Sequence, residues 1–410
     1  MKRIILFSFA ILLLSGCGLM GNNKQNKGAF HTGVYSNLFV ELLGLSAEEV
    51  KLKIDSAFNQ LFYGDDKNER VYYPVGEDMG YIVDINNNDV RTEGMSYGMM
   101  IAVQLNKKEV FDRLWKWAKT FMQHKEGPRK DYFAWHCRTN GEIISQGSAS
   151  DGEVWFVMAL FFASGRWGDG QGIFNYKQEA QNILDAMLSK TEFSDDKDVV
   201  TNMFCKKEKQ VVFVPDGEND NFTDPSYHVP HYYELWALWA DKENNFWREA
   251  ADTSRSFLKR AVHPKTGLAP DYSNFDGTPI DKWGRGHNNF QYDAWRVAMN
   301  IAVDYQWFAK DKWAVEQSNR LLNFFYSQGI KDYGSLFTLD GKELFPDHSE
   351  GLVAMNAVAA LASDLELRKE FVKELWELKI PTGHYRYYNG LLTMLGLLQV
   401  SGNFRIYHVN

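Results

Sequence analysis

The chain has 410 residues, enough for one large domain or two of ordinary size, and its 45% hydrophobic and 24% charged residues exclude general disorder and are typical of a soluble, folded protein. The 45 basic and 53 acidic side chains give a net charge of −8, which argues against nucleic-acid binding but leaves room for a local basic patch. Aromatic residues make up 15% of the chain, more than a core requires, and they suit stacking against flat, neutral ligands such as sugar rings.

The amino terminus has the pattern of an export signal. Lys2 and Arg3 precede an apolar run, Ile4–Leu14, that is too short to span a bilayer. The following Leu-Ser-Gly-Cys resembles a bacterial lipoprotein cleavage box, so we predict a signal peptide over residues 1–16 and a lipid on Cys17. The alternative is an ordinary secretory leader with an incidental cysteine. Loss of Lys2 and Arg3 would lower the net charge from −8 to −10. We expect an exported protein, anchored by lipid in the bacterial cell envelope.

Residues 17–30, rich in Asn, Lys and Gly, are predicted to form a flexible tether, and residues 31–410 a single domain. This domain contains Cys137 and Cys205. Two cysteines of an exported protein can pair, but two cysteines without a spacing pattern are more often buried thiols, and both alternatives stay open. The sequence does not indicate the oligomeric state.

Twelve segments with apolar residues at helical spacing follow one another from Ala47 onward, separated by clusters of Gly, Asp, Asn and Pro. Strand signals are few, and the clearest is a hairpin over Leu336–Phe345 around an Asp-Gly turn. The predicted helices cover approximately residues 47–62, 94–106, 108–123, 152–165, 175–190, 230–241, 243–261, 290–307, 311–328, 350–363, 365–378 and 387–400.

Twelve helices without a Pro-rich linker predict a single all-α domain, an (α/α)6 barrel of six helical hairpins; the alternative is an open helical array. Even-numbered helices such as 152–165 and 387–400 are apolar on every side, as buried inner helices are. Odd-numbered helices such as 243–261 and 365–378 carry charge on one side, as outer helices do. Parallel inner helices would place the residues that precede each of them at the same mouth of the barrel.

Three carboxylates stand at the starts of even-numbered helices: Glu93, Asp151 and Asp293. A single acid at a helix start is ordinarily explained by capping or by the helix dipole. Three at one mouth, set among aromatic side chains, instead favour the cleavage of a glycosidic bond, which needs one protonated acid and one ionised base or nucleophile. The aromatic side chains are Tyr97, Trp135, Tyr227, Tyr292 and Trp295.

Other chemistries find less support in the sequence. His228 and His231 lack the His-Glu-x-x-His pattern and are interpreted as a hydrogen-bonding set, so we predict neither a metal nor a cofactor. The chain has no phosphate-binding glycine loop, no Gly-x-Ser-x-Gly elbow and no Cys/His pair at nucleophile spacing. No further acidic cluster is visible near the motifs.

From about Pro74 to its end the chain resembles glycoside hydrolase family 8. Six stretches carry the resemblance in the family's order: 92–99, 133–135, 149–151, 225–227, 292–296 and 395–404. The resemblance implies an inverting enzyme with an (α/α)6 barrel, in which Glu93 is the general acid, Asp293 the general base and Asp151 the carboxylate that distorts the sugar. Inversion places the acid and the base roughly 6.5–9.5 Å apart, against about 5–5.5 Å for a retaining pair. Trp135 resembles the family's sugar platform and Arg296 the arginine that supports the site; the alternatives are a core tryptophan at Trp135 and a surface ion pair at Arg296. Together with Tyr97, Tyr227 and Tyr292, which stand among the carboxylates, they are the predicted substrate-binding residues.

Within this family, the segment before the tenth helix resembles that of the exo-acting enzymes that release xylose from the reducing end. In those enzymes a loop closes the cleft and a histidine recognises the anomeric hydroxyl, which implies a wall at residues 333–347 and a substrate contact at His348. His348 could instead cap the tenth helix together with Ser349. The expected partner is therefore a xylooligosaccharide. The rival hypotheses are an endo-acting xylanase or β-glucanase of the same family and a non-catalytic glycan-binding lipoprotein.

Overall fold

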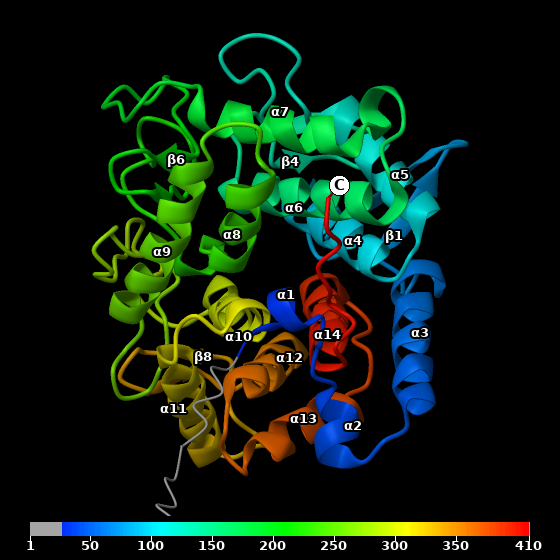
Figure 1. Ribbon diagram of the computed structural model, residues 1–410, viewed down its shortest axis with the longest axis vertical. Coiled ribbons are helices and arrows are strands. Elements are labelled where there is room, and N and C mark those ends of the chain that lie inside the picture. Colours follow the sequence, from blue (N-terminus) through cyan, green and yellow to red (C-terminus); the bar gives the residue numbers. More distant parts are fainter. Residues whose placement is uncertain (1–26, 410) are drawn as a thin grey trace, which may run out of the picture.

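Two concentric rings of helices form the domain (Figure 1). The computed structural model describes residues 27–409, and both rings lie within them. The inner ring consists of α4 (Thr92–Gln104), α6 (Ser150–Trp167), α8 (Pro230–Trp239), α10 (Arg296–Phe308), α12 (Glu350–Ala359) and α14 (Arg386–Val400). The outer ring consists of α3 (Ala47–Tyr63), α5 (Lys108–Trp117), α7 (Tyr176–Leu188), α9 (Asn244–Ala261), α11 (Trp313–Gln328) and α13 (Arg368–Glu377). The predicted (α/α)6 barrel is confirmed.

The polarity of each helix decides the ring in which it lies. Every residue of α6 from Ser150 to Ser164 is buried, because α6 has neighbours on all sides. By contrast, α9 buries one stripe at helical spacing that includes Phe246, Trp247 and Ala250, and it carries Lys259 and Arg260 in its last turn. The inner helices run in the same direction, so their amino ends meet at one mouth.

Three predicted helices contain turns of a different winding. The predicted helix 290–307 starts with a 3-10 turn, η4 (Tyr292–Trp295), before α10. The predicted helix 108–123 ends as a π turn, η1 (Ala118–Met122), and 350–363 ends as a 3-10 turn, η5 (Ala360–Ala362). Such turns are common at helix ends, and η4 places Asp293 beside the mouth.

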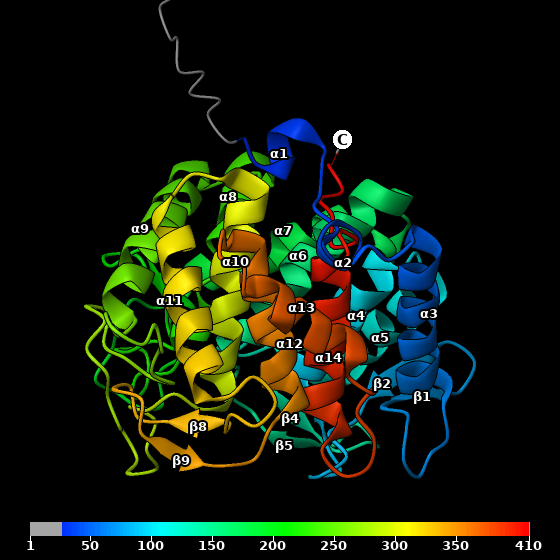
Figure 2. The same ribbon diagram turned by 90° about the horizontal axis from the view of Figure 1, so that it is seen from below.

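Short antiparallel strands gather mainly at the mouth, where Figure 2 shows β4, β5, β8 and β9 at one end of the barrel. The predicted hairpin is confirmed as β8 (Leu336–Phe337) paired with β9 (Glu343–Phe345). The remaining strands were not predicted, because two to four residues show no alternation. They are β1 (Tyr72–Val75) with β2 (Met79–Ile82), β3 (Val90–Arg91) with β4 (His136–Cys137) and β5 (Ile143–Ser145), and β6 (Phe204–Cys205) with β7 (Gln210–Val211).

The first described residues pack against the end of the barrel opposite the mouth, which we call the floor (Figure 2). The short helix α1 (Ala29–Thr32) is followed by α2 (Leu38–Leu43). A Cβ atom at Gly28 would lie 2.2 Å from the carbonyl oxygen of Trp307, so only glycine fits there. Because Ala29 is buried, folded structure begins within the last residues of the predicted tether, earlier than residue 31.

The predicted signal peptide and Cys17 lie outside the described residues. Cys137 and Cys205 are both buried and unpaired, which favours the buried-thiol alternative. No helix within residues 27–409 combines the length and the apolar composition that a membrane span requires.

Candidate active site

A cavity of about 680 Å³ opens at the mouth of the barrel. Its volume lies within the usual range of small-molecule sites. The lining side chains come from residues 84–93, 135–151, 227, 292–295, 335–350 and 381–389, so the segments that precede or open all six inner helices contribute. Parallel inner helices thus bring together residues that are far apart in the sequence.

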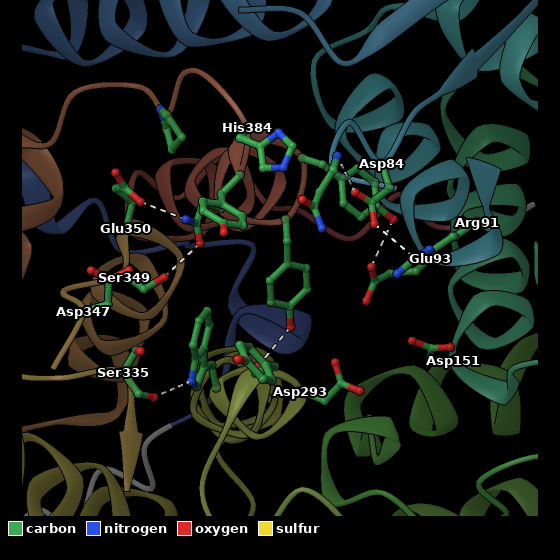
Figure 3. A pocket seen from close by; sticks show the side chains of 18 of the residues that line it. Asp84, Arg91, Glu93, Asp151, Asp293, Ser335, Asp347, Ser349, Glu350 and His384 are labelled. Carbon is green, nitrogen blue, oxygen red and sulfur yellow. Dashed lines mark hydrogen bonds and ion pairs between the residues drawn. The ribbon is translucent and has the colours of Figure 1, made fainter. Parts of the chain in front are cut away.

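Arg296 holds the three predicted carboxylates together. Its Nη1 lies 3.1 Å from Glu93 Oε2 and 3.0 Å from Asp151 Oδ2, and its Nη2 lies 3.0 Å from Asp293 Oδ1. The guanidinium is only 2% exposed, which excludes the surface ion pair considered from the sequence. Figure 3 shows the three carboxylates around one open space, with Glu93 and Asp151 on one side of it and Asp293 on another.

These contacts limit the separation between Glu93 and Asp293. The two terminal nitrogens of a guanidinium are about 2.3 Å apart, so Glu93 Oε2 and Asp293 Oδ1 lie at most about 8.4 Å from each other. Two carboxyl groups within this limit reach the same sugar ring.

Glycines allow the amino ends of the inner helices to approach closely. A Cβ atom at Gly94 would lie 2.7 Å from the hydroxyl of Tyr387, and one at Gly152 would lie 2.3 Å from Thr92 Oγ1. The glycine after each acid, Glu93-Gly94 and Asp151-Gly152, therefore brings α4 against α14 and α6 against α4.

Glu93 occupies a site that favours its protonated form. Burial raises the pKa of this carboxyl to about 7; Arg296 opposes the rise, and Asp293 and Asp151 add to it. Its Oε1 accepts a hydrogen bond of 3.0 Å from the hydroxyl of Tyr387. A carboxyl group with this pKa can donate a proton near neutrality.

Asp151 and Asp293 differ in exposure. Asp151 is 5% exposed, its Oδ1 accepts from the Gly152 amide at 2.9 Å, and burial raises its pKa while Arg296 opposes that rise. The side chain of Asp293 is 30% exposed and lines the cavity. A carboxylate that is paired with a guanidinium and reached by water can act as a base.

A further buried acid lies in α6, two residues after Asp151. Glu153 is fully buried, and its Oε1 accepts a hydrogen bond of 3.0 Å from the amide of Phe133. Burial raises its pKa to about 8. Glu153 does not line the cavity, so it acts on the stability of the barrel.

The predicted aromatic residues divide into two groups. Trp135, Tyr227, Tyr292 and Trp295 line the cavity. Trp135 also stacks on His136, with ring centroids 4.4 Å apart. Tyr97 does not line the cavity: it is 1% exposed and its hydroxyl accepts a hydrogen bond of 2.6 Å from Arg296. Neither Tyr97 nor Arg296 lines the cavity, so neither is placed to touch a ligand there. Both lie beneath the carboxylates and support them from inside the barrel.

His348 lines the cavity, and its chain neighbours Asp347 and Ser349 lie on the side opposite Asp84 and Arg91 (Figure 3). Its Nδ1 lies 2.8 Å from the carbonyl oxygen of Tyr333, and since a carbonyl only accepts, Nδ1 carries the hydrogen. His348 therefore does not cap α12, and Ser349 donates to Asn389 instead. Phe337 of the hairpin forms a β-bridge with Phe290, and the carbonyl oxygen of Ser335 accepts a hydrogen bond from the Trp295 indole. These two contacts connect the hairpin beside His348 to the segment that bears Asp293.

Two acids beside Asp293 were missed from the sequence. Asp224 and Asp271 are buried, and one oxygen of each lies within 4.8 Å of the other and of an oxygen of Asp293. Carboxylate oxygens at this spacing could hold a cation; the prediction that the site needs no metal stays a prediction. Asp224 directly precedes the 225–227 stretch and so stands close to the start of an inner helix, whereas Asp271 follows no helical signal.

Further lining residues also went unnoticed. Tyr387, Tyr388 and Asn389 open the twelfth predicted helix, so the rule that identified Glu93 and Asp151 would have found them too. Arg91 lines the cavity with its charge already matched by Asp84 at 3.1 Å and Asp89 at 3.0 Å. His228 and His231, by contrast, are buried. His228 lies within hydrogen-bond distance of Thr223 and Ser254, as a hydrogen-bonding role predicts, whereas Nδ1 of His231 has no hydrogen-bond partner within residues 27–409, so the prediction is not confirmed for His231.

Comparison with known proteins agrees with this geometry. The model of the glycosyl hydrolases family 8 matches residues 78–402. The chain is 46% identical over 389 residues to the reducing-end xylose-releasing exo-oligoxylanase Rex8A of Paenibacillus barcinonensis, covering 94% of this chain and 100% of the relative. A structure of that enzyme complexed with xylose is 47% identical, with a TM-score of 0.88 over 93% of this chain and 100% of that one. A xylohexaose complex of a catalytic mutant of a family 8 xylanase from Teredinibacter turnerae is 46% identical, with a TM-score of 0.89 and the same coverage.

Proposed function

The chain belongs to family 8 of the glycosyl hydrolases, and on that premise we propose that it is an inverting glycosidase that releases xylose from the reducing end of β-1,4-xylooligosaccharides. The observation that carries the activity is the placement of Glu93 and Asp293 around Arg296 within one cavity. The observation that favours exo action is His348 beside the hairpin that borders the cavity.

Glu93 acts as the general acid. With a pKa of about 7 its carboxyl holds a proton near neutrality, which it gives to the glycosidic oxygen as the bond to the anomeric carbon breaks. The departing xylose leaves with that proton on its new hydroxyl. The ionised Glu93 that results is stabilised by Arg296 and by the hydrogen bond from Tyr387.

Asp293 acts as the general base on the opposite face of the sugar. It removes a proton from a water molecule whose oxygen attacks the anomeric carbon, so the β-linkage yields an α-product in a single displacement. Asp151, buried and paired with Arg296, faces the sugar that bears the anomeric carbon and stabilises its distorted ring. Trp135 supplies a face on which this side of the oligosaccharide stacks.

His348 selects the reducing end. Because Nδ1 is committed to Tyr333, its Nε2 is free of that contact and can hydrogen-bond the anomeric hydroxyl of the leaving xylose. The hairpin and Phe345 border the cavity beyond this point. We expect this wall to leave room for one sugar beyond the point of cleavage, so that each cleavage releases xylose.

A timed product profile on xylohexaose tests this function. We expect xylose and xylopentaose from the first minutes, and no cleavage of xylohexaitol, whose reduced end lacks the anomeric hydroxyl. Replacement of His348 by alanine should lower kcat/KM for xylohexaose while Trp313→Ala, a control on the outer ring, should not. An early spread of lengths, or equal rates on the alditol, would identify an endo-acting xylanase or β-glucanase, and binding without cleavage would identify a glycan-binding lipoprotein.

The amino-terminal pattern supports a second proposal, that the protein is exported and held in the cell envelope by a lipid on Cys17. The support is the apolar run with its Leu-Ser-Gly-Cys box. Incorporation of labelled palmitate into the wild type, and its loss in Cys17→Ser but not in Cys205→Ser, is the expected result. Equal labelling of the two variants, or none in the wild type, would contradict it.

A further inference from the structure

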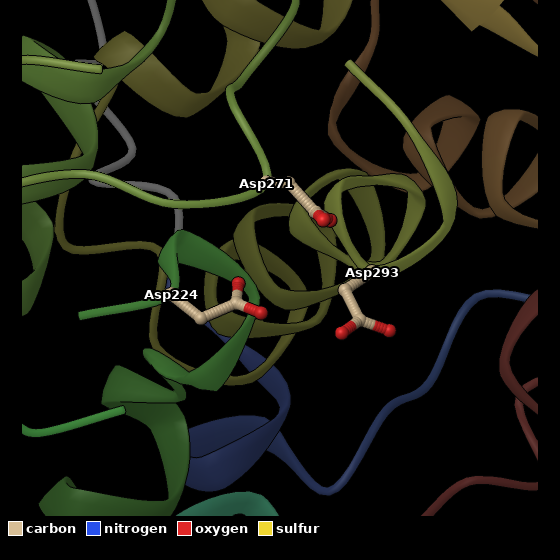
Figure 4. A group of neighbouring side chains, drawn as sticks. All are labelled: Asp224, Asp271 and Asp293. Atoms are coloured by element: carbon tan, nitrogen blue, oxygen red, sulfur yellow. The ribbon is translucent and has the colours of Figure 1, made fainter. Parts of the chain in front are cut away.

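Asp293 does not stand alone at its side of the cavity. Asp224, just before the 3-10 turn η3 (Pro225–Tyr227), and Asp271, in the connection after α9, lie behind it. Figure 4 shows the three carboxylates facing a common space, and one oxygen of each lies within 4.8 Å of the others. We call Asp224, Asp271 and Asp293 the acid cluster.

Asp271 has the partners of an ionised carboxylate. Its Oδ2 lies 2.7 Å from Nδ1 of His287 and accepts a hydrogen bond of 3.1 Å from the side-chain amide of Gln291. The Gln291 amide is a donor to this oxygen, and His287 is a second donor in the tautomer that carries the hydrogen on Nδ1; donors to a carboxylate favour its charged form. Its other oxygen, Oδ1, is buried and has no hydrogen-bond partner within the described part of the chain.

Asp224 has no such compensation. It is fully buried, its Oδ1 accepts a hydrogen bond of 2.6 Å from the amide of Ser226, and its Oδ2 has no partner among residues 27–409. The nearest guanidinium, that of Arg296, is already shared by Glu93, Asp151 and Asp293. A negative charge on Asp224 would therefore be buried next to two other carboxylates, and an unpaired buried charge is strongly disfavoured.

A proton on Asp224 removes this conflict. A protonated carboxyl group has an O–H donor, and the carboxylate oxygens within 4.8 Å of Asp224 belong to Asp271 and Asp293. At this distance the bond forms directly or through one water. The other ionisable groups that face Asp224 are Arg296, Tyr227 and Tyr272. Burial raises the pKa of both tyrosine hydroxyls, so both tyrosines stay protonated and neither takes the proton from Asp224.

The direction of the pKa shifts agrees with this assignment. Burial, with Asp293 and Asp271 nearby, raises the pKa of Asp224 well above its ordinary value. The pKa of Asp271 is raised to about 6, held down by His287 and Gln291, so that Asp271 is ionised at pH 7. The two acids behind Asp293 thus differ in protonation state at neutral pH.

We propose that Asp224 is a positioning residue which keeps its proton and donates a hydrogen bond to the Asp293 carboxylate, directly or through one water, so that the base stays ionised and oriented. This inference rests on the proposed role of Asp293 as the general base. A donated hydrogen bond stabilises the charged form of a carboxylate, so loss of the donor should move the acid limb of the activity to higher pH.

The acid limb of kcat/KM for xylotriose tests this role, with wild type compared against Asp224→Asn and Asp224→Ala. Asparagine keeps the donor and cannot ionise, so the limb should stay within about 0.3 pH unit of wild type; alanine should move it about one unit to higher pH. Asp220→Asn is the control, since Asp220 is also buried, at 2% exposed, and also has an unpartnered Oδ2 but lies outside the cluster. A downward shift in Asp224→Asn, as from loss of a repelling charge, or an unmoved limb in Asp224→Ala, would overturn the inference.

Infrared difference spectra of wild type against Asp224→Asn at pH 7 give a readout that needs no turnover. The expected difference is the carbonyl stretch of a protonated carboxyl group, and a carboxylate band in its place would overturn the inference even if the alanine variant does not fold. If wild type releases no xylose but shows the protonated band, the proposed function fails while the protonation state of Asp224 stands.

Discussion

Replacing Tyr387 by phenylalanine removes a single hydrogen bond from the proposed general acid. The Tyr387 hydroxyl donates to Glu93 Oε1 at 3.0 Å, and the ring itself is buried against Gly94. A hydrogen bond contributes about 1.5–3 kcal/mol when its acceptor is charged and about 0.5–1.5 kcal/mol when it is neutral, so its loss costs the ionised form of Glu93 about 1 kcal/mol more. At 1.36 kcal/mol per pH unit, the pKa of Glu93 should rise from about 7 to nearly 8.

The alkaline limb of kcat/KM for xylotriose measures this pKa, because activity requires Glu93 to be protonated and is lost as the pH rises through its pKa. In Tyr387→Phe this limb should move to higher pH by a little under one unit. Tyr132→Phe is the control, since the Tyr132 hydroxyl is equally buried but donates to the backbone of Thr201 at 3.1 Å. An unmoved limb, or one shifted to lower pH, would show that the Tyr387 bond does not favour the ionised acid or that another group sets the limb.

Four further predictions follow from the site. Glu93→Gln and Asp293→Asn should each lower kcat by about two orders of magnitude or more with KM nearly unchanged; near-normal turnover in either variant would remove that residue from its role. Arg296→Met should lower the free energy of unfolding, measured in urea, by about 3–5 kcal/mol at pH 7 and by less at pH 5, where the carboxyl groups can take up protons; equal losses would argue against a charge effect. The raised pKa of Glu153 should make wild type lose about 3 kcal/mol of stability as the pH rises from about 4.5 to 7, and Glu153→Gln should remove that part of the decline; parallel curves would show that Glu153 is not the group responsible. Dialysis against a chelator should leave xylose release unchanged, and a loss reversed by a divalent cation would instead place a metal in the acid cluster.

The barrel could be predicted because its helices differ in polarity. A segment such as 152–165, apolar on every side, has to be an inner helix, and the direction shared by the inner helices then brings Glu93, Asp151 and Asp293 to one end. Helix polarity and direction predict at which end of the barrel a residue lies, but not how deep its side chain lies below the mouth. Tyr97 lies four residues after Glu93, about one helical turn deeper, and so it supports Arg296 from below instead of facing the cavity.

Residues placed by irregular backbone could not be found in the same way. Asp271 lies in the long connection after α9, which is held by backbone hydrogen bonds between Thr223 and Ser273 and between Tyr272 and His287. No periodicity in the sequence reveals these contacts. Asp224 could not be identified for a different reason. It accepts a hydrogen bond from the amide of Ser226, as an ordinary capping residue does, and the sequence does not reveal that the same side chain also belongs to the acid cluster.

The packing of the floor has a practical consequence for attachment. Phe30 lies against His408 with ring centroids 5.6 Å apart, and the amide of Ile406 donates to the hydroxyl of Tyr35 at 3.0 Å, so the first and last described segments meet on the side away from the cavity. A solid support, a reporter domain or a cell surface joined through either segment would leave the carbohydrate entrance unobstructed. Their proximity also suits a circularly permuted chain, with the original ends linked and new ones cut into an outer loop.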